Sequence, residues 1–118
     1  MPLLARSHGA TLSVWFQFAV QIRRTEEFAG WLRGLWDLRA KAFIQARIER
    51  VICGNPGDVR PVGAGVSELR IHYGPGYRVS FQQRGLMLVI LLAGGDKSTQ
   101  IKDIKTAQDL ARNFKEDD

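Results

Sequence analysis

Residues 67–81, SELRIHYGPGYRVSF, place two alternating stretches on either side of a Gly-Pro-Gly turn, a pattern typical of a β-hairpin. If residues 74–76 form a three-residue loop, side-chain parity fixes the register of the two strands. One side then carries the apolar pairs, which are Tyr73 with Tyr77, Ile71 with Val79, and Leu69 with Phe81. The opposite side carries the polar pairs, which are His72 with Arg78, Arg70 with Ser80, and Glu68 with Gln82.

Downstream of the hairpin, the pattern predicts one more strand and a helix. Extended segments are expected over residues 66–73, 77–84 and 86–93, and the last of these, LMLVILLA, is apolar throughout, as in a central strand. The following Gly94-Gly95 pair is expected to end this strand. A helical period then runs from Ile101 to Phe114.

Upstream, alternation over residues 16–22 predicts a first strand, and two helices follow. Thr25 before two glutamates marks the start of a helix whose buried face extends to Trp31 and Trp36. Asp37 is expected to cap a second helix that ends before Gly54. The outer face of this helical hairpin carries cations, expected to be solvated or, alternatively, to contact a polyanion: Arg39, Lys41, Arg47 and Arg50.

These segments together predict an α+β domain over residues 17–115. Its mainly antiparallel four-stranded sheet is packed against an N-terminal helical hairpin and a C-terminal helix, and residues 58–65 are expected to form a loop. Residues 1–16 are interpreted as an N-terminal extension of uncertain order.

Composition restricts the classes of protein and of partner. The chain has 118 residues and a formal net charge of +5, which fits one domain and favours a polyanionic partner, although many small soluble proteins are basic. Its single cysteine, Cys53, allows no internal disulfide and indicates a reducing compartment, so we expect a cytoplasmic protein. No apolar run approaches the roughly 20 residues of a membrane span. No metal-ligand spacing is present, so neither a metal nor a cofactor is expected.

The polar side of the hairpin is expected to form an exposed cationic patch of Arg70, His72 and Arg78. Solvent exposure alone, with Glu68 as a partial counter-charge, would also explain these residues. Lys97, in the stretch GGDKST after the predicted central strand, adds a cation at a helix start that favours anions. Neither this stretch nor GPGYRV matches a nucleotide-binding loop.

Three blocks of the sequence resemble the HigB-type addiction-module killer proteins of the RelE/ParE toxin superfamily. They are RRTEEFAGWL, GNPGDVRPVGAGVSELRIHYGPGYRVSF and LLAGGDKSTQIKDI. The resemblance implies the toxin of a type II toxin–antitoxin system, with a cognate antitoxin as partner. For RelE-type members it implies an mRNA endonuclease that acts on translating ribosomes, with Arg70, Arg78 and Lys97 around the scissile phosphate.

The chain departs from the RelE pattern at two places. Glu68 stands where that pattern has a lysine, and Phe114 is the one aromatic residue near the C-terminus, where the pattern has a tyrosine. The same blocks also fit ParE-like members, which inhibit DNA gyrase without cutting RNA. Gyrase is therefore the partner in the alternative interpretation.

In the endonuclease interpretation, the ribose 2′-OH attacks the adjacent phosphate, so the protein supplies positioning, charge and proton transfer. The catalytic candidates are Arg70, Arg78 and Lys97 for the phosphate and His72 as general base. The candidates for RNA binding are Tyr73, Tyr77 and Arg60, since a tyrosine can stack on a base. Packing of the two tyrosines against each other beside the turn is the alternative.

Overall fold

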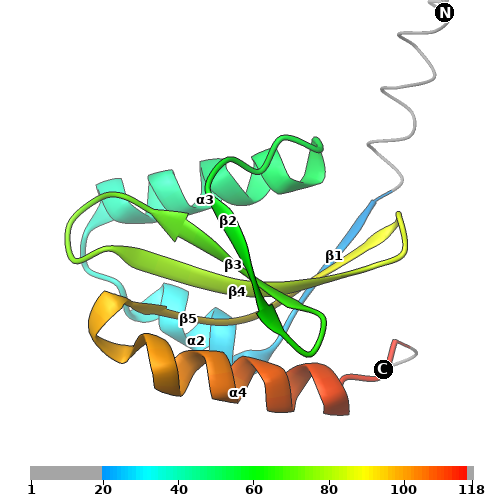
Figure 1. The fold of residues 1–118 in the computed structure, drawn as a ribbon. Coiled ribbons are helices and arrows are strands. Elements are labelled where there is room, and N and C mark those ends of the chain that lie inside the picture. The colour runs from blue at the N-terminus through cyan, green and yellow to red at the C-terminus, as the bar shows by residue number, and fades with distance from the viewer. Residues whose placement is uncertain (1–19, 117–118) are drawn as a thin grey trace, which may run out of the picture.

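The computed structural model describes residues 20–116 and shows an α+β fold with a five-stranded mixed sheet (Figure 1). The strand order is β1-β5-β4-β3-β2, in which only β1 and β5 pair in parallel. The elements along the chain are β1 (Gln21–Arg24), α2 (Glu26–Gly34), α3 (Leu38–Ile52), β2 (Val59–Gly63), β3 (Val66–Ile71), β4 (Tyr77–Arg84), β5 (Leu88–Asp96), the short 3-10 helix η1 (Lys97–Thr99) and α4 (Gln100–Asn113).

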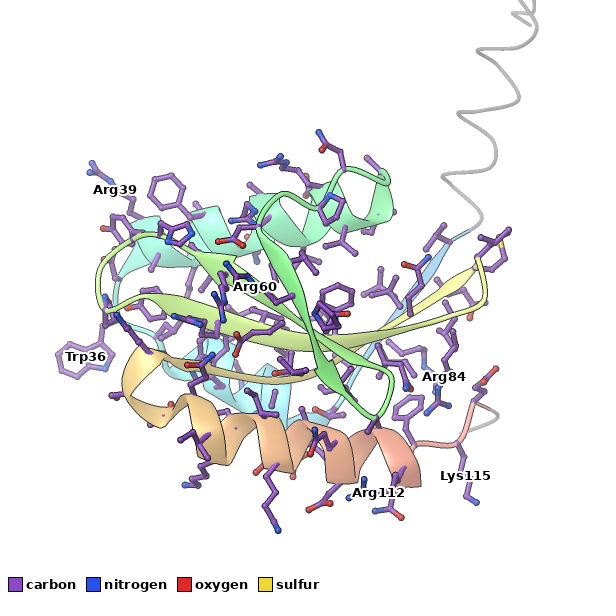
Figure 2. The ribbon with its side chains drawn as sticks, in the orientation of Figure 1. Trp36, Arg39, Arg60, Arg84, Arg112 and Lys115 are labelled. Atoms are coloured by element: carbon purple, nitrogen blue, oxygen red, sulfur yellow. The ribbon has the colours of Figure 1, made fainter. Side chains whose placement is uncertain are left out.

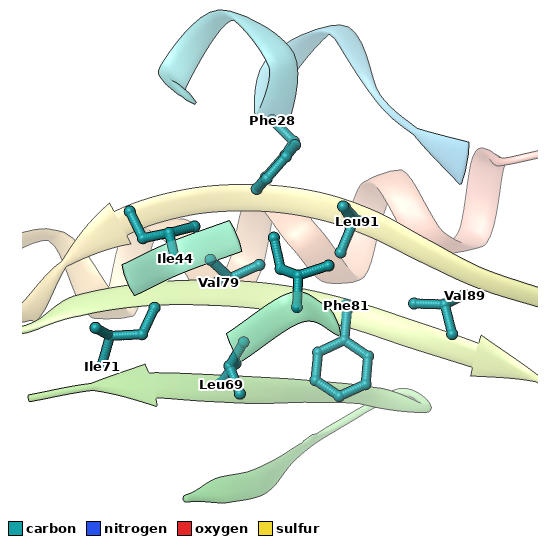
Figure 3. Packing of buried hydrophobic residues seen from close by; sticks show 9 residues of the cluster. Phe28, Ile44, Leu69, Ile71, Val79, Phe81, Val89 and Leu91 are labelled. Atoms are coloured by element: carbon teal, nitrogen blue, oxygen red, sulfur yellow. The ribbon is translucent and has the colours of Figure 1, made fainter. Parts of the chain in front are cut away.

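Apolar side chains are buried on both faces of the sheet. On one face, Phe28 of α2 and Ile44 of α3 pack on side chains of β3, β4 and β5, as Figure 3 shows: Leu69, Ile71, Val79, Phe81, Val89 and Leu91. On the other face, Ala107 and Ala111 of α4 pack on Ile90 and Leu92 of β5. Because β5 contributes to both clusters, its apolar sequence is explained by burial on two sides.

Both predicted helix caps are confirmed. The Thr25 hydroxyl accepts a hydrogen bond from the Phe28 backbone N–H at 3.0 Å, and the Asp37 carboxylate accepts one from the Arg39 N–H at 2.9 Å. The buried face predicted for the first helix, however, was extended too far toward the C-terminus. Helix α2 ends at Gly34, and Trp36 is 96% exposed. The expectation that Trp36 belongs to the core is therefore wrong.

The predicted loop over residues 58–65 contains the fifth strand, β2, so the expectation of four strands is wrong. Within the part of the chain that the structure describes, this strand pairs only with β3 and forms one edge of the sheet. An edge strand tolerates Pro61, since a missing backbone N–H can face solvent there. Of the strand expected over residues 16–22, only residues 21 and 22 lie in β1, which continues to Arg24. Phe16, Phe18 and the predicted extension over residues 1–16 lie outside the described residues.

The β3–β4 hairpin has a different register from the predicted one. Its last paired residues are Ile71 and Tyr77, so the loop spans residues 72–76 instead of three residues. Arg70 pairs with Arg78, not with Ser80, and His72 lies in the loop, unpaired with Arg78. The shift of two positions keeps every strand side chain on its predicted face, because strand parity repeats every second residue.

Gly94 and Gly95 lie within β5 and do not end it, which corrects the predicted strand end. A Cβ on Gly94 would lie 2.0 Å from Cε3 of Trp31, and one on Gly95 would lie 1.8 Å from Oδ2 of Asp103. The two glycines therefore allow α2 and α4 to approach opposite faces of the same strand.

Gly94→Ala is expected to destabilise the protein by about 1–3 kcal/mol, because the added methyl group must displace the Trp31 ring. Gly34→Ala is the matched control, since no atom of residues 20–116 lies within 4 Å of its added Cβ. Urea unfolding of both variants checks the prediction. Equal stability of the two variants would show that the Trp31 ring does not restrict Gly94.

Candidate functional site

Three arginines lie on the α4 side of the sheet, on three neighbouring strands. Arg70 of β3 is directly opposite Arg78 of β4, and Arg60 of β2 is opposite Glu68 of β3. Since paired strand residues point to the same side, these four side chains form one cluster. We call Arg60, Arg70 and Arg78 the arginine face; Figure 2 shows Arg60 on the near side of the sheet, beside β2.

Glu68 holds two of these arginines in place. Its side chain is 1% exposed, and its Oε1 accepts hydrogen bonds from Arg70 Nε at 3.1 Å and Arg78 Nη1 at 3.1 Å. Gln100 of α4 donates a third bond to the same oxygen at 2.9 Å. The carboxylate compensates one of the three positive charges and fixes the two guanidinium groups side by side.

Arg70 and Arg78 are less exposed than the sequence predicted. Only 23% of the Arg70 side chain and 12% of the Arg78 side chain are accessible, because both lean over the buried Glu68. The expectation of freely exposed side chains is therefore wrong. A guanidinium group with one N–H bonded to Glu68 keeps further N–H donors for another acceptor.

His72 pairs with Asp58 at the β2 side of the arginine face. The distance from His72 Nε2 to Asp58 Oδ2 is 2.6 Å. The hydrogen bond from His72 is the main cause that lowers the pKa of Asp58, and the charges of Arg60 and Arg70 lower it further. Asp58 was not among the sequence candidates, because a carboxylate in a turn-rich stretch gives no pattern of its own.

Arg47 fixes the backbone around this pair. It donates to the Arg70 carbonyl at 2.6 Å and to the Asp58 carbonyl at 3.2 Å, and Arg70 N–H also donates to the Asp58 carbonyl at 3.0 Å. The expectation that Arg47 lies on a solvated outer face of the helical hairpin is therefore wrong. Its inward position fixes the backbone of Asp58 beside β3.

Lys97 lies at the same end of the sheet as the Arg70–Arg78 pair. It follows Asp96, which pairs with Tyr77, and its Cβ is 3.5 Å from where a Cβ on Gly76 would lie. The side chain is exposed and forms no ion pair with the residues that the structure describes. The structure thus brings Lys97 beside the β3–β4 loop.

The two tyrosines lie away from the arginine face. Tyr73 donates a hydrogen bond from its hydroxyl to Asp37 Oδ2 at 2.8 Å, and its ring is 4.9 Å from that of Phe43. The Tyr77 ring packs edge-on against Trp31 at 6.2 Å. Both tyrosines pack against the core on the α2–α3 side, so the sheet separates them from Arg70 and Arg78. The two rings contact these neighbours instead of the predicted site.

The described residues contain no cluster of three or more His, Cys, Asp or Glu side chains that could hold a metal ion. None of the helices over residues 20–116 has the length and apolar character needed to cross a membrane.

A protein of Haemophilus influenzae, described as an uncharacterized protein, is similar to this chain over most of its length. The two are 55% identical over 95 residues, which cover 80% of this chain and 96% of that protein. The chain belongs to the family of this Haemophilus protein. No family model and no solved structure matches the chain. The family relationship thus spans nearly the whole Haemophilus protein.

Proposed function

We propose that this protein is the toxin of a type II toxin–antitoxin system and that it cleaves mRNA. The observation that carries the proposal is the Arg70–Arg78 pair, held side by side by Glu68 and flanked by the His72–Asp58 pair. The resemblance of the sequence to HigB-type members of the RelE/ParE superfamily supports the same proposal and implies a RelE-like arrangement of the helices and strands.

In the proposed reaction, the ribose 2′-oxygen attacks the adjacent phosphorus and the bond from phosphorus to the 5′-oxygen breaks. The products are a 2′,3′-cyclic phosphate and a free 5′-hydroxyl. Negative charge accumulates on the phosphate oxygens in the transition state, where preorganised cations act best. Arg70 and Arg78 would donate paired hydrogen bonds to these oxygens, and Lys97 would add a point charge.

The His72–Asp58 pair supports a role for His72 in proton transfer. The imidazole has one ring nitrogen bound to Asp58, and the other has no hydrogen-bond partner among the described residues. A carboxylate that orients a histidine in this way is a common feature of general bases. His72 would accept the proton of the 2′-hydroxyl, the leaving 5′-oxygen would take a proton from water, and no metal or cofactor is needed.

One observation favours the alternative, an inhibitor of DNA gyrase without nuclease activity. The Glu68 carboxylate accepts hydrogen bonds from both arginines and compensates part of their positive charge. An inhibitor needs only a stable binding surface, and such a charge arrangement serves that purpose without any proton transfer.

In either case the proposed partner is a cognate antitoxin in the cytoplasm, with an acidic segment that covers the arginine face. The proposed substrate is mRNA, either free in solution or bound to the ribosome.

The proposal is tested by adding the purified protein to a translation extract and, in parallel, to a gyrase supercoiling assay. We expect cleaved mRNA with 2′,3′-cyclic phosphate ends and unaffected supercoiling. An RNA with a single 2′-deoxy residue at the cut site is the matched control and should resist cleavage there. Intact mRNA together with blocked supercoiling would replace the nuclease proposal with the gyrase alternative.

A further inference from the structure

Trp36 lies almost wholly in solvent, between α2 and α3. It is 96% exposed, although tryptophan is among the residues most buried on average. Helix α2 ends at Gly34, so Trp36 does not lie on the helix face that packs against the core. Tryptophan is enriched at interfaces, and a side chain exposed to this degree is available for a contact outside the chain.

Two contacts locate Trp36 relative to the arginine face. Its neighbour Asp37 accepts the hydrogen bond from Tyr73, which ties this segment to the β3–β4 loop over residues 72–76. Lys97 approaches the same loop at Gly76. The Arg70–Arg78 pair is the second-to-last pair before this loop. Trp36, in the segment between α2 and α3, therefore shares one end of the sheet with Lys97 and the two arginines, and a strand of RNA would pass around that end to reach the arginine face. Figure 2 shows Trp36 projecting from that end of the molecule.

The side chains around Trp36 favour a polyanionic partner. Residues 33–41 carry three cations, Arg33, Arg39 and Lys41, against one carboxylate, Asp37, and Arg33 also pairs with Glu26 at 3.6 Å. Leu38 is the exposed apolar neighbour. An exposed aromatic ring with an excess of cations on the same segment is a combination by which proteins hold single-stranded nucleic acid, since bases stack on the ring while cations bind the phosphates.

We propose that Trp36 is a stacking platform for an unpaired base of an RNA strand whose backbone runs over Lys97 to the arginine face. This inference rests on the proposed function and gives the site its aromatic contact, in place of the predicted Tyr73 and Tyr77. The ligand is single-stranded RNA, recognised by its base faces and its phosphates.

The test is binding of a fluorescently labelled single-stranded 2′-deoxy oligonucleotide, which the proposed reaction does not cleave, measured by fluorescence polarisation. Trp36→Ala is expected to weaken binding by about 5- to 150-fold, the range found when a stacking aromatic is removed. Trp36→Phe should restore most of the affinity, whereas Trp36→Leu should not, because leucine keeps apolar area but cannot stack. Leu38→Ala is the control for a neighbouring exposed apolar residue and should bind like the wild type.

All variants should melt like the wild type, since both residues are exposed. Equal binding by wild type and Trp36→Ala, full rescue by Trp36→Leu, or no oligonucleotide binding by the wild type would overturn the inference. If the wild type cleaves mRNA but Trp36→Ala binds normally, only the stacking inference fails. If Trp36→Ala binds weakly but the wild type cleaves no mRNA, stacking stands and the nuclease proposal fails.

Discussion

Arg78→Ala is expected to reduce mRNA cleavage by about 100- to 1000-fold, the typical effect of removing one preorganised donor to a developing negative charge. Lys97→Ala is expected to reduce it as well, through loss of a point charge beside the phosphate. Arg78→Lys should restore little activity, because an ammonium group cannot reproduce the two-pronged contact of a guanidinium with phosphate. Cleavage rates measured in a translation extract check all three variants.

The controls separate chemistry from folding. Arg78 is bonded to the buried Glu68, so Arg78→Ala requires a thermal melt alongside the assay, whereas Lys97 is exposed and should be replaceable without loss of stability. Lys105→Ala removes the same charge from an exposed position on α4 and should leave cleavage unchanged. Toxicity in cells that survives both Arg78→Ala and Lys97→Ala would rule out a catalytic role for the arginine face.

Glu68→Ala is expected to lower the free energy of unfolding by about 3–5 kcal/mol, the usual cost of removing one partner of a buried ion pair. The substitution leaves Arg70 and Arg78 opposite each other and largely buried without their shared acceptor, and it also removes the partner of Gln100 on α4. Glu68→Gln keeps an acceptor oxygen and the side-chain volume, so its loss should be smaller. Chemical denaturation measures both.

Glu49→Ala is the matched control, since Glu49 is an exposed glutamate of α3 and its removal should change stability by less than about 0.5 kcal/mol. If Glu68→Ala unfolds at the same denaturant concentration as Glu49→Ala, Glu68 does not hold the arginine face together.

Features fixed by neighbouring residues were predictable from the sequence. The caps at Thr25 and Asp37 involve hydrogen bonds over two or three positions, and strand parity placed Arg70 and Arg78 on the face away from Val79. Both kinds of pattern involve only a few neighbouring residues, so they can be recognised without knowledge of the rest of the chain.

Features fixed by distant residues were missed. Gly94 was interpreted as a strand end, because its need to admit the Trp31 ring is visible only when α2 and β5 are packed together. The edge strand β2 was not recognised, because Pro61 and the glycines around it are typical of a loop. At the candidate site, the sequence supplied the arginines, but neither the burial of Glu68 nor the contact of Asp58 with His72 has a local signal.

The parallel pairing of β1 with β5 has a consequence for how the protein acquires its structure during synthesis. The Thr25 hydroxyl donates to the Leu92 carbonyl across 67 positions of the sequence, and Gln21 pairs with Leu88 over a similar span. At roughly 5–20 residues per second, the ribosome adds the β5 residue of each pair about 3–13 s after its partner at the N-terminal side. Until then β1 has no strand to pair with, and Phe28 lacks much of the surface it packs on. Folding of the N-terminal strand is therefore expected to wait for β5 to leave the ribosome, and a nascent chain halted earlier would expose apolar surface that the finished protein buries.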